Sequence, residues 1–309
     1  MHLKKILIIL GAGAFCAVIA AAYYAGIMVY ATGSSPEKKI GFLDNITNSL
    51  YLQQQAPRKS FSFLVIGDIQ SGNRDFAQYV FIARDNGCSF MIQTGDLASH
   101  ATTACYALVR YGIASAGLDM PLFIVPGNHD VRGNPLLFEK YFSSRQFFFF
   151  YSGCLFIVFD NAAGPPYDRQ FDWLEQTLEE NHRNARRVFV FMHREPVEWE
   201  QGAPHPALDD YARFFDLQQR FPLDCVFTGH VHSYRQCAIR GTTYISNGLE
   251  CEMKGIELQA AQVTLVTVTP NAVTTKKIPV RLSLLHFWGG KLFGGMVTKV
   301  YPVIQNIFG

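Results

Sequence analysis

Apolar runs with the length of strands alternate with helix-like stretches between residues 60 and 130. The strand-like runs are Phe61–Ile66, Phe90–Gln93 and Leu122–Val125, and the helix-like stretches between them are Phe76–Asp85 and Ala101–Tyr111. Each strand ends at a polar cluster, and the first polar side chains after the glycines of these clusters, at positions 68, 96 and 128, are 28 and 32 residues apart. That spacing is about one βαβ unit (~30 residues), so it predicts parallel strands whose carboxyl ends share one edge of a sheet.

The pattern continues with a different spacing to about Val280. The predicted strands are Phe147–Tyr151, Cys154–Phe159, Arg187–Met192, Cys225–Phe227, Thr243–Ile245 and Gln262–Val268, and the predicted helix is Arg169–His182. A turn at Gly241 predicts a hairpin flanked by Cys237 and Cys251, which either form a disulfide or stay reduced. Alternating strands and helices are typical of an α/β domain, which we place at residues 60–280.

The N-terminal segment is apolar over a length that suits a membrane. A short tail (1–5) ends in Lys4 and Lys5, and residues 6–31 carry no charge. These 26 residues exceed both the ~20 that cross a bilayer as a helix and the ~7–15 of a signal-peptide apolar region. We therefore expect an uncleaved single-pass signal anchor, with cleavage after Ala31 as the alternative.

Charge and composition refine this expectation. Lys4 and Lys5 favour a cytoplasmic N-terminus, although Lys38 and Lys39 on the other side of the apolar segment weaken that bias. Only 17% of the 309 residues are charged, 14% are aromatic and the net charge is +2. This composition leans toward a membrane-associated protein and indicates no basic surface for nucleic acid. We expect the catalytic domain on the extracytoplasmic side, periplasmic or extracellular.

Two further segments flank the predicted domain. Residues 32–59 read as a polar linker that contains the glycosylation sequon Asn45-Ile46-Thr47. Residues 281–309 have apolar positions at helical spacing, with Lys291 and Lys299 outside the apolar stripe. This amphipathic C-terminal tail is predicted to lie in the membrane interface or, as the alternative, to pack on the domain.

Five polar clusters follow the strand-like runs. They are Gly67-Asp68-Ile69-Gln70, Gly95-Asp96, Gly127-Asn128-His129-Asp130, Met192-His193 and Gly229-His230-Val231-His232. Their side chains are carboxylates, amides and imidazoles, the ligands that suit Mn, Mg, Fe or Zn. An ordered series of such clusters at strand ends predicts a metal centre.

In their order, these clusters resemble the motifs of the calcineurin-like metallophosphoesterase superfamily, Asp-x-His, Gly-Asp, Gly-Asn-His-Asp/Glu, His and Gly-His-x-His. The resemblance covers about residues 60–270 and implies a four-layer α/β/β/α sandwich with two divalent metal ions (Mn, Fe, Zn or Mg). It implies a set of ligands for these ions: Asp68 and His232 for the first, Asn128, His193 and His230 for the second, and Asp96 as the bridge. It also implies that His129 is the catalytic imidazole and that Asp130 orients it.

Some positions depart from the family pattern or extend it. Gln70 stands where the family usually has His, a variant that resembles the branch of manganese-dependent ADP-ribose/CDP-alcohol pyrophosphatases. We interpret Gln70 as an oxygen ligand of the first metal, with a structural role as the alternative. Ser99 stands where many members have Asp, which removes a contact around the site. Arg194, next to His193, is a candidate for binding a phosphate oxygen, and His100 lies in a nearby polar loop.

The resemblance implies a hydrolase that cleaves a phosphomonoester, phosphodiester or pyrophosphate bond by direct attack of a metal-bound hydroxide. Together with the predicted anchor, it suggests a phosphorylated small molecule or a lipid headgroup as substrate. The alternative is a non-catalytic, membrane-anchored binding or scaffold protein that keeps the fold, with its first metal site weakened by Gln70.

Overall fold

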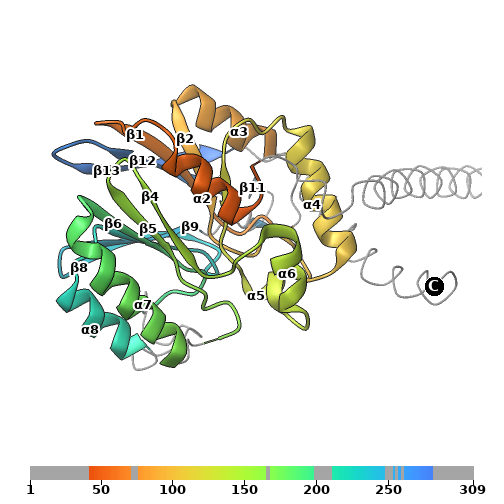
Figure 1. Cartoon of the computed structure of the whole chain (residues 1–309). Coiled ribbons are helices and arrows are strands. Elements are labelled where there is room, and N and C mark those ends of the chain that lie inside the picture. The colour runs from red at the N-terminus through yellow and green to blue at the C-terminus, as the bar shows by residue number, and fades with distance from the viewer. Residues whose placement is uncertain are drawn as a thin grey trace, which may run out of the picture. The chain divides into compact units, whose positions relative to one another are not determined.

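The computed structural model describes residues 42–70, 76–164, 168–197, 211–247, 253–254, 257–258 and 261–280 (Figure 1). The chain divides into two compact units, Met1–Lys38 and Lys39–Gly309, and every described residue belongs to the second. The predicted anchor and the predicted C-terminal tail lie outside the described residues. Within the described part of the chain, no helix is long and apolar enough to cross a membrane.

Two β-sheets form the framework of the domain (Figure 1). The first has the order β13-β12-β1-β2-β3, with β1 (Phe61–Ile66), β2 (Cys88–Gln93), β3 (Leu122–Ile124), β12 (Ala261–Val268) and β13 (Val273–Val280). The second has the order β4-β5-β6-β7-β9-β8, with β4 (Phe147–Tyr151), β5 (Cys154–Val158), β6 (Arg187–Phe191), β7 (Cys225–Thr228), β8 (Tyr234–Ile239) and β9 (Thr242–Asn247). Strands β1, β2 and β3 are parallel to one another, as are β5, β6, β7 and β9.

The helices are α2 (Asn45–Gln53), α3 (Phe76–Asp85), α4 (Thr103–Ser115), α5 (Asn128–Val131), α6 (Pro135–Phe142), α7 (Asp168–Asn181) and α8 (Ala212–Arg220), and a 3-10 turn (His182–Asn184) follows α7. A two-stranded ribbon joins β10 (Met253–Lys254) and β11 (Glu257–Leu258).

The predicted elements are present with ends shifted by four residues or fewer. The predicted hairpin is β8–β9, where Arg240 and Gly241 take positive φ (53° and 84°) in the turn. Cys237 lies in β8, and Cys251 lies outside the described residues.

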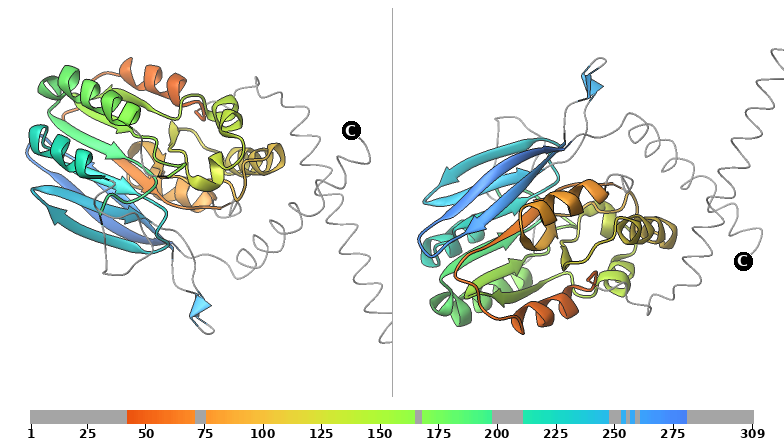
Figure 2. Two further views of the ribbon diagram at one scale, coloured as in Figure 1. Left: turned by 90° about the horizontal axis from the view of Figure 1, so that it is seen from below. Right: turned by 90° about the horizontal axis from the view of Figure 1, so that it is seen from above.

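Aromatic side chains fill the space between the two sheets. Phe63 of β1 stacks on Phe90 of β2 with ring centroids 5.1 Å apart, and it meets Phe156 of β5 edge-on at 5.5 Å. All three rings are fully buried, which stabilises the fold by about 1.5–3 kcal/mol each. Helices α3, α4 and α6 pack on the outer face of the first sheet, and α7 and α8 pack on that of the second (Figure 2). The result is a mixed α/β fold with two sheets, as the sequence predicts.

Helix α2 falls within the segment predicted to be a polar linker, so that prediction is wrong for this part of the chain. The Asn45 amide pairs with the free edge of β3: its Nδ2 donates to Ile124 O (2.9 Å), and its Oδ1 accepts from Ile124 N (2.8 Å). Asn48 Nδ2 donates to Leu122 O on the same edge (3.0 Å). Both asparagines are buried, so α2 is a part of the domain and the sequon asparagine has no room for a glycan.

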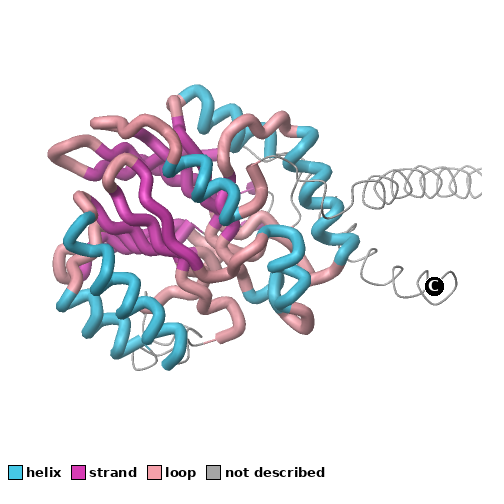
Figure 3. Tube along the Cα trace, in the orientation of Figure 1, coloured by secondary structure: helices cyan, strands magenta, loops and turns pink. Residues whose placement is uncertain are grey.

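The strand registers place the motif-bearing loops at one end of the sandwich. In the first sheet Ile66 pairs with Gln93, and Gln93 pairs with Ile124. In the second sheet Phe191 pairs with Phe227. Parallel strands that end in register deliver the following loops to one edge, where the loops of both sheets gather (Figure 3).

Candidate metal centre

Three of the predicted ligands sit on left-handed backbone. Gln70, Asp96 and His230 have φ of 44°, 54° and 66°. Such conformations cost non-glycine residues about 1–3 kcal/mol each and persist only where the surroundings enforce them. Three of the seven described non-glycine residues with positive φ therefore lie in the motif loops at this end of the sandwich.

The motif glycines let these loops touch. A Cβ on Gly127 would lie 1.9 Å from Asp96 N, and a Cβ on Gly95 would lie 2.3 Å from His193 Nδ1. Both contacts are far inside van der Waals distance, and the atoms met are backbone or a buried ring. A side chain at Gly127 would therefore push its loop away from the loop of Asp96, and a side chain at Gly95 would push its loop away from His193.

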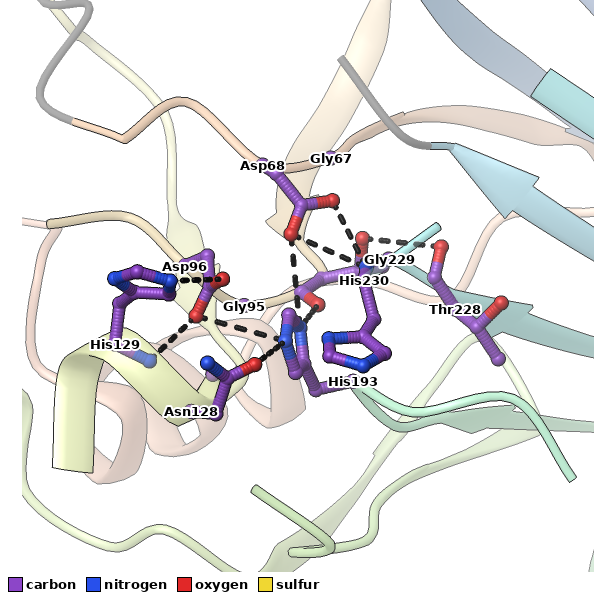
Figure 4. Close-up of polar contacts among 12 residues, drawn as sticks. Gly67, Asp68, Gly95, Asp96, Asn128, His129, His193, Thr228, Gly229 and His230 are labelled. Carbon is purple, nitrogen blue, oxygen red and sulfur yellow. Dashed lines mark hydrogen bonds and ion pairs between the residues drawn. The ribbon is translucent and has the colours of Figure 1, made fainter. Parts of the chain in front are cut away.

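Three electron-rich atoms converge at the centre of the site (Figure 4). His193 Nδ1 lies 3.0 Å from the Thr94 carbonyl oxygen, which can only accept, so the ring proton is on Nδ1. The lone pair of His193 Nε2 therefore faces Asn128 Oδ1 (3.0 Å) and Asp96 Oδ1 (3.5 Å). Burial lowers the pKa of His193, which keeps the ring neutral. Three acceptors that face one another repel unless a cation lies between them, so these residues fit a divalent metal ion.

Asp68 extends the cluster toward the first-metal side. Ligand atoms of Asp68, Asp96 and His193 lie within 4.8 Å of one another, and all three residues are buried. Burial, and next the negative charge of Asp96, raise the pKa of Asp68 well above its usual range. Both Asp68 oxygens accept from the backbone N–H of His230 (3.1 and 3.0 Å), which connects the two sheets.

Gln70 and His232, both predicted for the first metal, lie next to each other. Gln70 Nε2 is 3.4 Å from His232 Nε2. His232 also lies close enough to Asp68 for its charge to lower the pKa of that carboxyl. The structure therefore brings the altered motif position next to the other residue predicted for the first ion.

His129 is held by a backbone carbonyl. Its Nδ1 donates to Ser99 O (2.8 Å), and its Nε2 lies 3.9 Å from Asp96 Oδ2. The ring is 31% exposed at the mouth of the site, next to the ring of His100 (centroids 6.3 Å apart). Ser99 thus lacks the carboxylate of the family pattern but still orients the imidazole through its main chain.

The prediction that Asp130 orients His129 is wrong. Asp130 is fully buried and points away from the ring: its oxygens accept from the backbone N–H groups of Leu97 (3.1 Å), Ala98 (2.8 Å) and Gly127 (3.0 Å). Tyr106 O–H donates to its carbonyl. Burial and the charge of Asp96 raise the pKa of Asp130 to about 8. Asp130 therefore fastens the Gly95 loop to the Gly127 loop and does not touch a reacting group.

Two supporting residues follow strands of the second sheet and were not identified from the sequence as part of the site. Asn161, after β5, accepts on Oδ1 from the backbone N–H groups of His193 and Arg194 (both 3.0 Å). Glu195 Oε1 accepts from Val231 N (3.1 Å) and Ser246 Oγ (3.1 Å), and burial raises the pKa of Glu195 to about 7. The only sequence signal for Asn161 is its place at the end of a strand on the active edge.

Arg194 lies inside the site. Its Nη1 is 3.1 Å from His230 Nε2, and the ring of His230 stands 5.0 Å from that of His193. The predicted residues Asp68, Asp96, Asn128, His193, His230 and Arg194 are therefore together, and His129 is at their edge.

The sequence profile of the calcineurin-like phosphoesterase family matches residues 61–234, which is more than half of the chain. The chain belongs to this family. No curated protein sequence is significantly similar to it.

Solved structures with the same fold share little sequence with the chain, and their likeness shows the fold alone. A purple acid phosphatase from yellow lupin (Lupinus luteus) seeds is 14% identical with a TM-score of 0.61, over 72% of this chain and 52% of that one. GAP50, the anchor in the inner membrane complex of Plasmodium, is 15% identical with a TM-score of 0.58 (72% and 85% covered). A dimetal phosphatase from Danio rerio is 13% identical with a TM-score of 0.57 (72% and 99% covered).

Proposed function

We propose that this protein is a membrane-anchored phosphoesterase that uses two divalent metal ions to hydrolyse a phosphomonoester, phosphodiester or pyrophosphate bond. The observation that carries this proposal is the convergence of His193 Nε2, Asn128 Oδ1 and Asp96 Oδ1, three atoms that can each coordinate one cation placed among them. Asp68 adds a second buried carboxylate within 4.8 Å. When bound, a pair of divalent ions polarises the phosphoryl group and acidifies a water molecule.

The protein's own residues would hold the two ions and position the phosphoryl group and the leaving oxygen. Asp68, Gln70 and His232 are assigned to the first ion, Asn128, His193 and His230 to the second, and Asp96 to both. His129 keeps one proton on Nδ1 through Ser99 O, so its Nε2 is the nitrogen that faces the site and exchanges a proton with the leaving oxygen. Arg194 supplies a positive charge for the phosphoryl oxygens.

Turnover of bis-p-nitrophenyl phosphate with Mn²⁺ tests this function. Asp96→Ala removes the predicted bridging carboxylate and is expected to lower the rate of p-nitrophenol release by about a thousandfold or more, because each ion loses a ligand. The control is Asp119→Ala, since Asp119 is an exposed carboxylate paired with Arg84. If neither this ester nor related phosphoesters show Mn²⁺-dependent, Asp96-dependent turnover, the enzyme proposal is wrong.

A second candidate is a non-catalytic, membrane-anchored scaffold with the same fold. Two observations favour it: Gln70 replaces an imidazole ligand, and one structural neighbour is itself described as an anchor. The turnover experiment separates the two candidates, because a scaffold releases no p-nitrophenol either with its native Asp96 or after the Asp96→Ala substitution.

The membrane part of the proposal is supported by the uncharged residues 6–31. We place the N-terminus in the cytoplasm and the catalytic domain outside it, where its substrate is a phosphorylated small molecule or a lipid headgroup. Alkaline carbonate extraction tests the anchor: a spanning segment keeps the protein in the membrane pellet, and release into the supernatant contradicts it.

A further inference from the structure

The side chain of Gln93 connects the two loops that carry the predicted carboxylate ligands of the first sheet. Its Nε2 donates to Gly67 O (3.1 Å) and to Gly95 O, and its Oε1 accepts from Gly95 N (3.0 Å). Gly67 directly precedes Asp68, and Gly95 directly precedes Asp96. One amide group therefore holds the residue next to each carboxylate.

The hydrogen bonds of the Gln93 amide follow directly after those of the strand ladder. Main-chain hydrogen bonds join β1 to β2 as far as Thr94 N and Ile66 O (2.9 Å), and they join the following loops at Gln70 N and Asp96 O (2.9 Å). The bonds of the Gln93 side chain lie between these two points. The amide therefore continues the ladder across the positions from which both carboxylates extend.

An amide side chain matches the three backbone groups that it meets here. Gly67 O and Gly95 O accept and need donors, whereas Gly95 N donates and needs an acceptor. An ionised carboxylate would supply no donor, and an apolar side chain would supply neither. Gln93 is fully buried, so the backbone groups that it bonds would stay unpaired if the amide were removed.

The separation of the two carboxylates matters for a pair of metal ions. Both carboxylates point toward the ring of His193 (Figure 4), and ligand atoms of Asp68, Asp96 and His193 lie within 4.8 Å of one another. Ions in two-metal sites are about 3.5–4 Å apart, so a small shift of either loop changes which ligand atoms can reach both ions. Thr94, next to Gln93, accepts on its carbonyl from His193 Nδ1 (3.0 Å), so the end of β2 holds all three groups.

We propose that Gln93 is a positioning residue that sets the separation of the Asp68 and Asp96 carboxylates, and with it the spacing of two bound divalent ions. This inference rests on the proposed two-ion centre. Gln93 acts through the two loops, because its own amide is occupied by backbone groups.

Electron paramagnetic resonance of the full-length protein loaded with two equivalents of Mn²⁺ tests the spacing. Two Mn²⁺ ions that share a carboxylate give a spin-coupled spectrum, whereas separate ions give the spectrum of isolated Mn²⁺. Gln93→Met keeps an unbranched side chain of similar size but removes its donors and its acceptor. The fraction of bound Mn²⁺ in coupled pairs is expected to fall by at least about threefold, and the weaker Mn²⁺ dissociation constant to rise by about tenfold.

Gln218→Met is the matched control. Gln218 of α8 is also a buried glutamine whose amide joins two elements, with Nε2 donating to Ile239 O (3.0 Å) and Oε1 accepting from Tyr244 O–H (2.7 Å). Its replacement removes comparable hydrogen bonds outside the motif loops, so the coupled fraction and the Mn²⁺ constants are expected to stay within about twofold of the wild type. Equal losses in the two variants would show a general effect of destabilisation and would overturn the proposal.

Two further results separate this inference from the proposed function. A coupled pair in the wild-type protein that persists unchanged in Gln93→Met overturns the inference and leaves the two-ion centre standing. Isolated Mn²⁺ alone in the wild-type protein refutes the two-ion centre and this inference with it. If Gln93→Met does not fold, Gln93→Asn takes its place: its amide is one methylene too short to bond both loops, so the coupled fraction must fall by at least about twofold.

Discussion

The two sheets contribute different predicted ligands to one site, and the supports around these ligands differ. The segments after β1, β2 and β3 of the first sheet carry the predicted oxygen ligands Asp68, Asp96 and Asn128, two of which are buried carboxylates. Loops after β6 and β7 of the second sheet supply the imidazoles His193 and His230. Oxygen and nitrogen donors are therefore separated by sheet, and packing of the two sheets brings them together.

The supports on the two sides differ in the number of backbone groups that each one holds. On the oxygen side, the central support is Asp130, which binds three backbone N–H groups of two loops. On the imidazole side, the Asn161 and Glu195 side chains bind the backbone next to His193 and His230. Every one of these supports is a buried side chain, but Asp130 accepts from three backbone N–H groups and Asn161 Oδ1 from two, so loss of Asp130 leaves more backbone donors without an acceptor.

The largest expected effect on this comparison comes from removing Asp130, the support of the predicted oxygen ligands. Asp130→Ala leaves three backbone N–H groups without their acceptor and is expected to lower the free energy of unfolding by about 3 kcal/mol or more. Urea denaturation of the metal-free protein measures this loss. Asp119→Ala, which removes an exposed ion pair with Arg84, should cost less than about 1 kcal/mol. Equal stabilities of the two variants would refute the structural role of Asp130.

On the imidazole side, Asn161→Ala is expected to reduce function more than stability. Loss of the acceptor for His193 N and Arg194 N lets the imidazole loop shift, so Mn²⁺ affinity and turnover should fall by about 10–100-fold. Titration with Mn²⁺ and the rate of p-nitrophenol release measure the two losses. Asn181→Ala, which removes a bond to Thr177 O at the end of α7, should leave both unchanged. Wild-type affinity in Asn161→Ala would show that the loop does not need this support.

Gln70→His tests the separation of oxygen and nitrogen donors, because it adds an imidazole to the loop after β1 of the first sheet. Histidine tolerates the positive φ of this position better than most residues, and a nitrogen ligand suits Zn²⁺ more than Mn²⁺. The ratio of Zn²⁺ to Mn²⁺ affinity is therefore expected to rise by about tenfold, as measured by metal competition. Gln236→His, on an exposed position of β8, controls for metal binding by an added surface histidine. A ratio that moves equally in both variants would show that Gln70 is not a ligand.

The smallest expected effect is a dependence of Mn²⁺ affinity on pH. Because burial and Asp96 raise the pKa of Asp68, part of this carboxyl is protonated in the metal-free protein and must lose its proton to bind the ion. His193, whose pKa burial lowers, is already neutral and releases none. Apparent affinity should rise with pH, by at most about tenfold per pH unit for one displaced proton. Calorimetry in buffers of different ionisation enthalpy counts that proton, and a count of zero would contradict the assignment.

The strands and the motif loops could be predicted because apolar runs and polar clusters are properties of the sequence itself. The role of Asp130 could not. Its position next to His129 suggested a pair, but consecutive residues on a helical turn point in different directions, and α5 turns Asp130 into the core. The bond from His129 to Ser99 uses a main-chain carbonyl, which leaves no trace in the identity of the residue.

Helices α2 and α6 were missed for different reasons. The asparagines of α2 look like surface residues, and only the structure shows that their amides take the place of a neighbouring strand on β3. Helix α6 has a start signal in its sequence, with Asn134 as the N-cap and Pro135 in the first turn. Helix α2 thus depends on tertiary contacts that the sequence does not reveal, whereas the start of α6 is indicated by local sequence.

The packing of α2 decides where the domain can be cut from the rest of the chain for production. A truncation at residue 60, the end of the expected linker, would delete Asn45 and Asn48 and leave the edge of β3 with unpaired N–H and C=O groups. Exposed strand edges recruit strands from other molecules, so such a fragment is expected to aggregate. A fragment that begins before Phe42 retains the helix and keeps that edge closed.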